Sequence, residues 1–151
     1  MNREEIPRYI KNSPPGSVII LDAPSGYGKT KALHEAKNLI GKSVAILSYE
    51  EVVNDIVRYL QNDNSGADVT DIIPSLAKKC RVFAIEDIDF LEGKEATQKC
   101  ICDIINKLAD YKTTVIVLTG TDIRQKIPKL VQNIHNVTYI KKLNSTQKDH
   151  L

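Results

Sequence analysis

The sequence predicts an α/β domain in which helices cover both faces of a central parallel sheet. Four short runs are apolar without alternation, which is typical of strands buried on both faces. The stretches between these runs are long enough for helical crossovers and carry apolar residues at helical spacing. Right-handed βαβ units are therefore expected. The runs are residues 18–21, 44–47, 82–85 and 115–118, and a fifth strand is expected at 137–140.

Two helices can be placed between the strands with their apolar stripes toward the sheet. The first follows the second strand, and Ser48 and Glu51 form a capping-box pattern at its start. Its apolar stripe consists of Val52, Val53, Ile56, Val57 and Leu60. The second follows the third strand and repeats the pattern with Ala96, Cys100, Ile101, Ile104, Ile105 and Leu108. Between the two helices, a polar loop at 62–68 and a short amphipathic helix at 71–79 lengthen the crossover.

Length and composition indicate one soluble, cytoplasmic domain. With 151 residues the chain is too short for two full domains. Its net charge of +2 provides no general attraction to nucleic acid, so any DNA contact would have to be local. No apolar run approaches the roughly 20 residues that cross a bilayer, and the N-terminus has no apolar targeting core. Cys80, Cys100 and Cys102 lack the spacing of a zinc site and are interpreted as structural thiols.

A phosphate-binding loop follows the first strand and leads directly into a helix, and this context favours it over an ordinary glycine-rich turn. Gly26 and Gly28 allow successive backbone amides to point inward around phosphates. Lys29 would place its ammonium against the β- and γ-phosphates, and the Thr30 hydroxyl would ligate magnesium. Ala23 stands where the pattern has its first glycine. The predicted nucleotide-binding residues are Ala23, Pro24, Ser25, Gly26, Tyr27, Gly28, Lys29, Thr30 and Lys31.

Polar residues also follow the third and fourth strands, at the sheet edge where open α/β sheets bind ligands. Glu86 and Asp87 are predicted catalytic residues: Glu86 holds magnesium together with Thr30, and Asp87 orients or deprotonates an attacking water. A solvated acidic turn is the alternative for this pair. Thr119 is predicted to hydrogen-bond the γ-phosphate or the attacking water. Asp122 either lies beside it or only caps a helix that follows.

These segments resemble the nucleotide-binding domain of DnaA-type initiators within the AAA+ ATPases. The resemblance covers residues 12–121 and rests on the segments APSGYGKTKALHEA, VAILSYEEVVNDIVRYLQN and FAIEDIDFLEGKEATQKCICDIINKL. The last segment is the most specific, because its acidic pair, Asp-Phe-Leu turn and Gly-Lys-Glu-Ala-Thr-Gln helix opening are similar to DnaA and its relative Hda. The implied fold is α/β, a three-layer P-loop NTPase of the AAA+ type. It has about five parallel strands, helices on both faces and no helical lid.

The resemblance also implies ATP or ADP and Mg²⁺ as ligands. Matched by motif, Lys29 and Thr30 are Walker A residues. Glu86 and Asp87 are the Walker B pair, and Thr119 approximates sensor I. The extra helix near 71–79 is implied to belong to an initiator-specific insertion that touches single-stranded DNA. The basic residues that could make this contact, or simply form a solvated edge, are Lys78, Lys79 and Arg81.

The chain departs from the family pattern in several places. Glu86 replaces an aspartate, which lengthens the magnesium ligand by one methylene. The stretch 130–136 contains no arginine finger to stabilise transition-state charge, which predicts slow hydrolysis or none. The chain begins at a helix that the family places after its adenine-contacting segment, and it ends just after a helix-cap pattern at 144–146. Residues 1–151 are therefore expected to form a single AAA+ core, truncated at the start of the lid subdomain.

The leading hypothesis is an ATP- and Mg²⁺-binding DnaA-like module that acts in replication initiation or its regulation, with weak hydrolysis. Its partner would be a second copy or another replication protein, and it would be cytoplasmic or associated with the nucleoid. A helicase loader similar to DnaC or IstB is a second hypothesis, although the basic N-terminal extension usual in loaders is missing. A nucleotide-responsive interaction module without turnover is a third. A small-molecule P-loop kinase is disfavoured, because the five arginines form no lid-like cluster.

Overall fold

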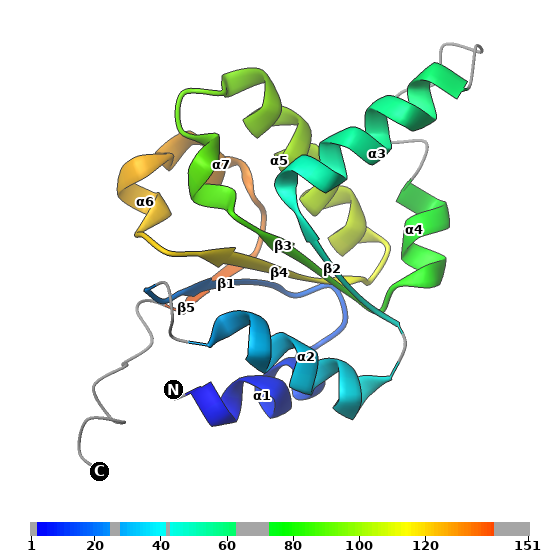
Figure 1. Cartoon of the computed structure of the whole chain (residues 1–151), viewed down its shortest axis with the longest axis vertical. Coiled ribbons are helices and arrows are strands. Elements are labelled where there is room, and N and C mark those ends of the chain that lie inside the picture. Colours follow the sequence, from blue (N-terminus) through cyan, green and yellow to red (C-terminus); the bar gives the residue numbers. More distant parts are fainter. Residues whose placement is uncertain (1–2, 25–27, 42, 63–72, 141–151) are drawn as a thin grey trace.

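The centre of the molecule is a parallel sheet of five strands in the order β2-β3-β4-β1-β5 (Figure 1). The computed structural model describes residues 3–24, 28–41, 43–62 and 73–140. The strands are β1 (Val18–Asp22), β2 (Val44–Ser48), β3 (Val82–Glu86), β4 (Thr114–Thr119) and β5 (Val137–Ile140). All five predicted strands are confirmed, and each observed end lies within one residue of the prediction.

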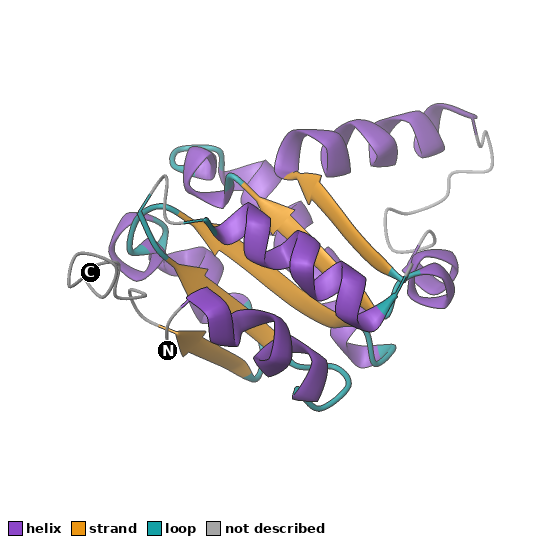
Figure 2. Cartoon of the chain, turned by 60° about the horizontal axis from the view of Figure 1, so that its bottom comes forward, coloured by secondary structure: helices purple, strands orange, loops and turns teal. Residues whose placement is uncertain are grey.

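Helices cover both faces of this sheet, which confirms the predicted three-layer arrangement. One face carries the 3₁₀ helix η1 (Arg3–Glu5), α1 (Ile6–Asn12) and α2 (Lys29–Ile40). Figure 2 shows α1 and α2 in front of the strands on this side. The other face carries α3 (Tyr49–Asn62), α4 (Ile73–Lys79), the 3₁₀ helix η3 (Ile88–Leu91), α5 (Glu95–Asp110), α6 (Ile123–Lys126) and α7 (Pro128–Asn133).

The side chains of β1 alternate between two hydrophobic cores. Val18 and Ile20 pack into the core beneath α5, whereas Ile19 and Leu21 pack against α1 and α2. The strands β1, β3 and β4 are buried almost throughout because neighbouring strands flank them and helices lie above and below. The outer strands β2 and β5 are mostly half-buried. Unbroken apolarity was therefore the correct signal for the central strands.

The crossover between β2 and β3 follows the prediction where it can be compared. The predicted capping box is confirmed: the Glu51 amide donates to Ser48 Oγ at 3.1 Å, and the Ser48 amide donates to Glu51 Oε1 at 3.2 Å. Val52 is buried and Val53 half-buried, while the side chains of the other stripe residues, at 56, 57 and 60, lie outside the described part. Residues 63–68 of the predicted loop and the predicted helix cap at 144–146 also lie outside the described residues. The predicted helix at 71–79 is described from Ile73.

The helix α5 buries four of the six predicted apolar residues. Ile101, Ile104, Ile105 and Leu108 are fully buried against the sheet. Ala96 is exposed in the first turn. Cys80 and Cys102 are buried free thiols and Cys100 is half-buried. Among the described helices, none is long and apolar enough to cross a membrane.

Candidate functional site

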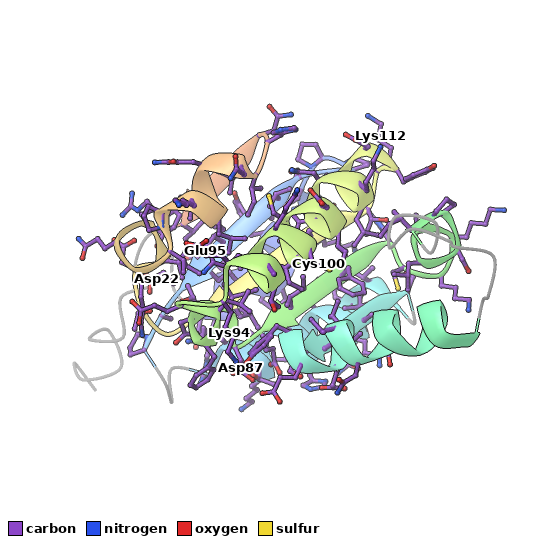
Figure 3. All side chains as sticks on the ribbon, turned by 90° about the horizontal axis from the view of Figure 1, so that it is seen from above. Asp22, Asp87, Lys94, Glu95, Cys100 and Lys112 are labelled. Atoms are coloured by element: carbon purple, nitrogen blue, oxygen red, sulfur yellow. The ribbon has the colours of Figure 1, made fainter. Side chains whose placement is uncertain are left out.

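A cavity of about 510 Å³ opens at the edge of the sheet where the strands end. Because all strands are parallel, the residues that follow β1, β3 and β4 meet at this edge. Figure 3 shows Asp22 and Asp87 together at this end of the molecule, with Lys112 at the opposite end. The cavity is lined by Gly28, Lys29, Thr30, Glu86, Asp87, Asp89, Phe90, Leu118, Thr119 and Gly120.

Lys29 is held at the centre of this edge by the ends of two neighbouring strands. Its ammonium donates to the backbone carbonyls of Ala23 and Thr119, the latter at 3.0 Å. Burial lowers the pKa of Lys29, and nearby carboxylates, Asp89 foremost, act in the opposite direction. Gly28 precedes it with φ 102°, a left-handed conformation that favours glycine. The ammonium group of Lys29 is thus held in a fixed position at the start of α2.

Thr30 and Glu86 bring two oxygen atoms together beside this cation. The Thr30 hydroxyl donates to Glu86 Oε1 at 2.7 Å, which joins the start of α2 to the end of β3. The additional methylene of Glu86 therefore still allows the contact. Hydroxyl and carboxylate oxygens suit Mg²⁺, which keeps several waters and takes further oxygens from phosphates. Within the described ranges, no group of three or more His, Cys, Asp or Glu could hold a metal ion.

The turn after β3 carries two further carboxylates into the cavity. Asp87 adopts a left-handed backbone with φ 63°, an uncommon conformation that aspartate tolerates and that often occurs at functional sites. Burial raises the pKa of Asp87, with added repulsion from Glu86, Asp89 and Glu50. Asp89 lines the same cavity and was missed by the sequence prediction. A third acidic residue two positions after the pair was the available signal.

Thr119 lies at the cavity, but its hydroxyl is already occupied by its own turn. Thr119 Oγ1 donates to the Thr121 carbonyl at 2.8 Å and accepts from the Thr121 amide at 3.2 Å. The side chain is almost fully buried. Its hydrogen bond to a phosphate or water stays a prediction, whereas its carbonyl holds Lys29. Asp122 caps α6 by accepting from the Arg124 amide at 3.0 Å, so the predicted helix cap is confirmed.

The remaining predicted residues are placed as follows. Ala23 is buried at the end of β1, and Pro24 and Lys31 are exposed. Ser25, Gly26 and Tyr27 lie outside the described residues. The group of three basic residues predicted to contact DNA is exposed, near the end of β3 that lies away from the cavity. Two of its members are in the last turn of α4. The DNA contact itself stays a prediction. Its members are Lys78, Lys79 and Arg81.

A polar network on the β5 side of the same edge was not predicted. The Tyr139 hydroxyl lies 3.2 Å from Asp22 Oδ2 and 2.9 Å from Asp122 Oδ1. Arg124 forms two side-chain hydrogen bonds with Asp122, both at 3.1 Å. Its guanidinium carbon lies 4.0 Å from the centre of the Tyr139 ring. Asp22 and Tyr139 are separated by 117 positions, and Asp22 at the end of an apolar strand was the only local signal.

Comparison with known sequences identifies a family for this chain. The sequence model described as the bacterial DnaA ATPase domain matches residues 10–142. The chromosomal replication initiator protein DnaA of Clavibacter sepedonicus is 31% identical over 98 residues, which are 62% of this chain and 20% of that protein. The DnaA of Aliarcobacter butzleri is 31% identical over 113 residues, 73% of this chain and 24% of that protein. The chain thus spans about a fifth to a quarter of these relatives.

Comparison with solved structures agrees on the fold. Domain III of the Thermotoga maritima replication initiation protein DnaA superposes with a TM-score of 0.67 at 18% identity, covering 98% of this chain and 68% of that one. A DnaA bound to AMPPCP and single-stranded DNA superposes with a TM-score of 0.65 at 19% identity, covering 98% of this chain and 49% of that one. At these identities the likeness establishes the three-layer architecture.

Proposed function

Because the chain belongs to the bacterial DnaA ATPase-domain family, we propose that it binds ATP with Mg²⁺ around Lys29 and acts in replication initiation or its regulation. One observation carries the proposal: the Thr30 hydroxyl contacts Glu86 at 2.7 Å beside the fixed ammonium of Lys29. A magnesium triphosphate needs a cation for its phosphates and hard oxygen ligands for its metal. The cation and one oxygen ligand are on adjoining residues at the start of α2, and the second oxygen ligand is Glu86 at the end of β3.

Each residue has a distinct part in this proposal. Lys29 exchanges its bonds to the carbonyls of Ala23 and Thr119 for bonds to phosphate oxygens. Thr30 and Glu86 would hold Mg²⁺, which would neutralise charge on the phosphates. Asp87 serves as the general base toward an attacking water, because burial raises the pKa of its carboxyl and makes the carboxylate a stronger base.

We propose in addition that hydrolysis is slow. Of the described residues that line the cavity, Lys29 alone carries positive charge, against the carboxylates of Glu86, Asp87 and Asp89. A second cation would be needed to stabilise the charge that develops as the terminal phosphate leaves. A turnover in the purified chain above about 1 s⁻¹, the lower end of typical enzyme turnover, would contradict this part.

Nucleotide binding is tested by the Lys29→Ala variant in a thermal unfolding assay. A ligand present at 100 times its Kd stabilises a protein by about 2.7 kcal/mol, which raises the Tm of a chain of this size by roughly 5–10 °C. We expect ATP with Mg²⁺ to raise the Tm of the wild type and to leave that of Lys29→Ala unchanged. Lys37→Ala is the matched control, because Lys37 is exposed in the last turn of the same helix. Equal stabilisation of all three proteins would refute the proposal.

A further inference from the structure

Two carboxylates on the β5 side of the sheet edge compete for one hydroxyl proton. The Tyr139 oxygen is within hydrogen-bond distance of both Asp22 Oδ2 and Asp122 Oδ1, at 3.2 Å and 2.9 Å. A phenol has one proton and can donate to only one of them. The other carboxylate oxygen then faces an oxygen lone pair, which is repulsive unless that carboxyl carries a proton of its own. The contact is therefore complete only when one of the two carboxyls holds an additional proton.

Asp122 is the carboxylate that stays charged. It accepts three hydrogen bonds from Arg124: from the backbone amide at 3.0 Å, and from Nε and Nη2 at 3.1 Å each. These bonds lower the pKa of Asp122 to about 2. Arg124 is itself held against the Tyr139 ring. Tyr139 consequently donates to Asp122, and the additional proton belongs on Asp22.

Asp22 is placed to respond to charge at the nucleotide site. It is 5% exposed, and burial raises the pKa of its carboxyl. Four groups on neighbouring elements modify that pKa: Tyr139 on β5, Asp122 and Arg124 at α6, and Lys29 on α2. Of these, the charge of Asp122 raises the pKa and the charges of Lys29 and Arg124 lower it, and a hydrogen bond from Tyr139 lowers it only where the hydroxyl donates to Asp22. Lys29 is thus one of the groups that favour the charged form of Asp22.

The backbone connects Asp22 directly to the group that would receive the phosphates. Asp22 precedes Ala23 and pairs in register with Thr119, and the carbonyls of these two residues hold the Lys29 ammonium. Phosphates bound at Lys29 would bring negative charge beside this cation and cancel its effect on Asp22. The uncharged form of Asp22 is then favoured.

We propose that Asp22 takes up a proton when the phosphates of a nucleotide bind at Lys29. The Asp22 carboxyl then donates to the Tyr139 oxygen, and Tyr139 donates to Asp122. Each of the two hydrogen bonds then has its own proton. These two hydrogen bonds connect the end of β1 to β5 and to the start of α6. The inference rests on the proposed nucleotide site, and it adds the uptake of a proton by Asp22 to the binding of the nucleotide.

The sign of the pH dependence follows from linkage. If binding raises the pKa of Asp22, affinity is greatest below the pKa of the free protein, where Asp22 is protonated in both states. Affinity falls as the pH rises from that value to the pKa of the bound state, and is constant above it. Nucleotide binding takes up protons across this interval.

Titration calorimetry in two buffers of different ionisation enthalpy measures the protons taken up with ATP and Mg²⁺. We expect the full chain to take up more protons than Asp22→Asn at pH values above the usual aspartate range and below the range in which lysines titrate. The terminal phosphate of the nucleotide titrates in this interval too, but equally for both proteins. Asp110→Asn is the control, because Asp110 is exposed at the far end of α5. It should match the wild type.

Equal proton uptake by the wild type and Asp22→Asn would overturn the inference. Tyr139→Phe provides a second test that does not depend on the folding of Asp22→Asn. It removes the oxygen that would accept the Asp22 proton in the bound state, so the protonated form of Asp22 loses its partner and uptake should decrease. Uptake that is unchanged in Tyr139→Phe would also overturn it. Absence of any nucleotide binding by the wild type would instead refute the proposed function, and this inference with it.

Discussion

The β3 side and the β5 side of the sheet edge both carry carboxylates, but these differ in their partners. On the β3 side, Glu86 accepts from the Thr30 hydroxyl and faces an open cavity. On the β5 side, Asp122 accepts from Tyr139 and three times from Arg124. A carboxylate with acceptor capacity left over can serve a ligand, whereas one surrounded by donors fixes the elements that supply them. Position at a strand end thus does not by itself define a carboxylate's role.

The largest expected effect is on the magnesium dependence of nucleotide affinity, which should depend on the β3 side and not on the β5 side. Glu86→Gln should reduce the Mg²⁺-dependent part of nucleotide affinity by about 10- to 100-fold, the usual cost of losing a polar group that supports a metal site. Affinity for a fluorescent ATP analogue, measured with and without Mg²⁺, checks this. Asp22→Asn on the β5 side, and Glu92→Gln at an exposed position after η3, should keep the wild-type magnesium dependence. If Glu86→Gln also keeps the wild-type magnesium dependence, the carboxylates of the two sides do not differ in metal binding and the comparison fails.

An intermediate effect is expected at Thr119, which lies between the two sides. Thr119→Val preserves shape but leaves the Thr121 amide without its hydroxyl acceptor. We expect a loss of about 0.5–1.5 kcal/mol in the free energy of unfolding, the usual net contribution of one intramolecular hydrogen bond. Denaturant titration measures it, with the exposed Thr121→Val as control. A loss below about 0.5 kcal/mol, as at ordinary surface sites, would show that this bond does not hold the turn.

The smallest effect concerns Asp122 and appears only in acid. Its pKa is lowered from 3.8 to about 2, so the folded protein prefers the charged form. The stabilisation from this charge is complete above pH 3.8 and is lost as the pH falls through about 2. Asp122→Asn should therefore be less stable than wild type by a constant amount at higher pH, and the difference should shrink in acid. Thermal unfolding at several pH values tests this, and a difference independent of pH would contradict it.

Local patterns were sufficient for the strands, the capping box and the cap of α6, because each depends on residues that are close in the chain. Ser48 and Glu51 are three positions apart, and Asp122 and Arg124 only two. The meeting of Lys29, Thr30 and Glu86 was also anticipated, since parallel strands place their following residues at one edge. These parts required no knowledge of strand order.

The parts that could not be predicted depend on strand order or on one backbone angle. Tyr139 reaches Asp22 because β5 lies beside β1, and nothing in the local sequence of either strand specifies that neighbour. Asp89 lines the cavity two residues after Asp87, whose left-handed conformation is rare for residues other than glycine. The Thr119 hydroxyl was assigned to a ligand, whereas its own turn competes for it.

The position of β1 between β4 and β5 also has a consequence for how the chain folds. Val18 pairs with Val115 and Val137, so the centre of the sheet joins the beginning of the chain to segments about a hundred residues later. Such distant contacts slow folding, because a long loop must close before the pairing stabilises it. During synthesis, the Thr119 carbonyl that holds Lys29 is available only after β4 has left the ribosome. The phosphate-binding loop is thus made early, but its lysine is locked in place late.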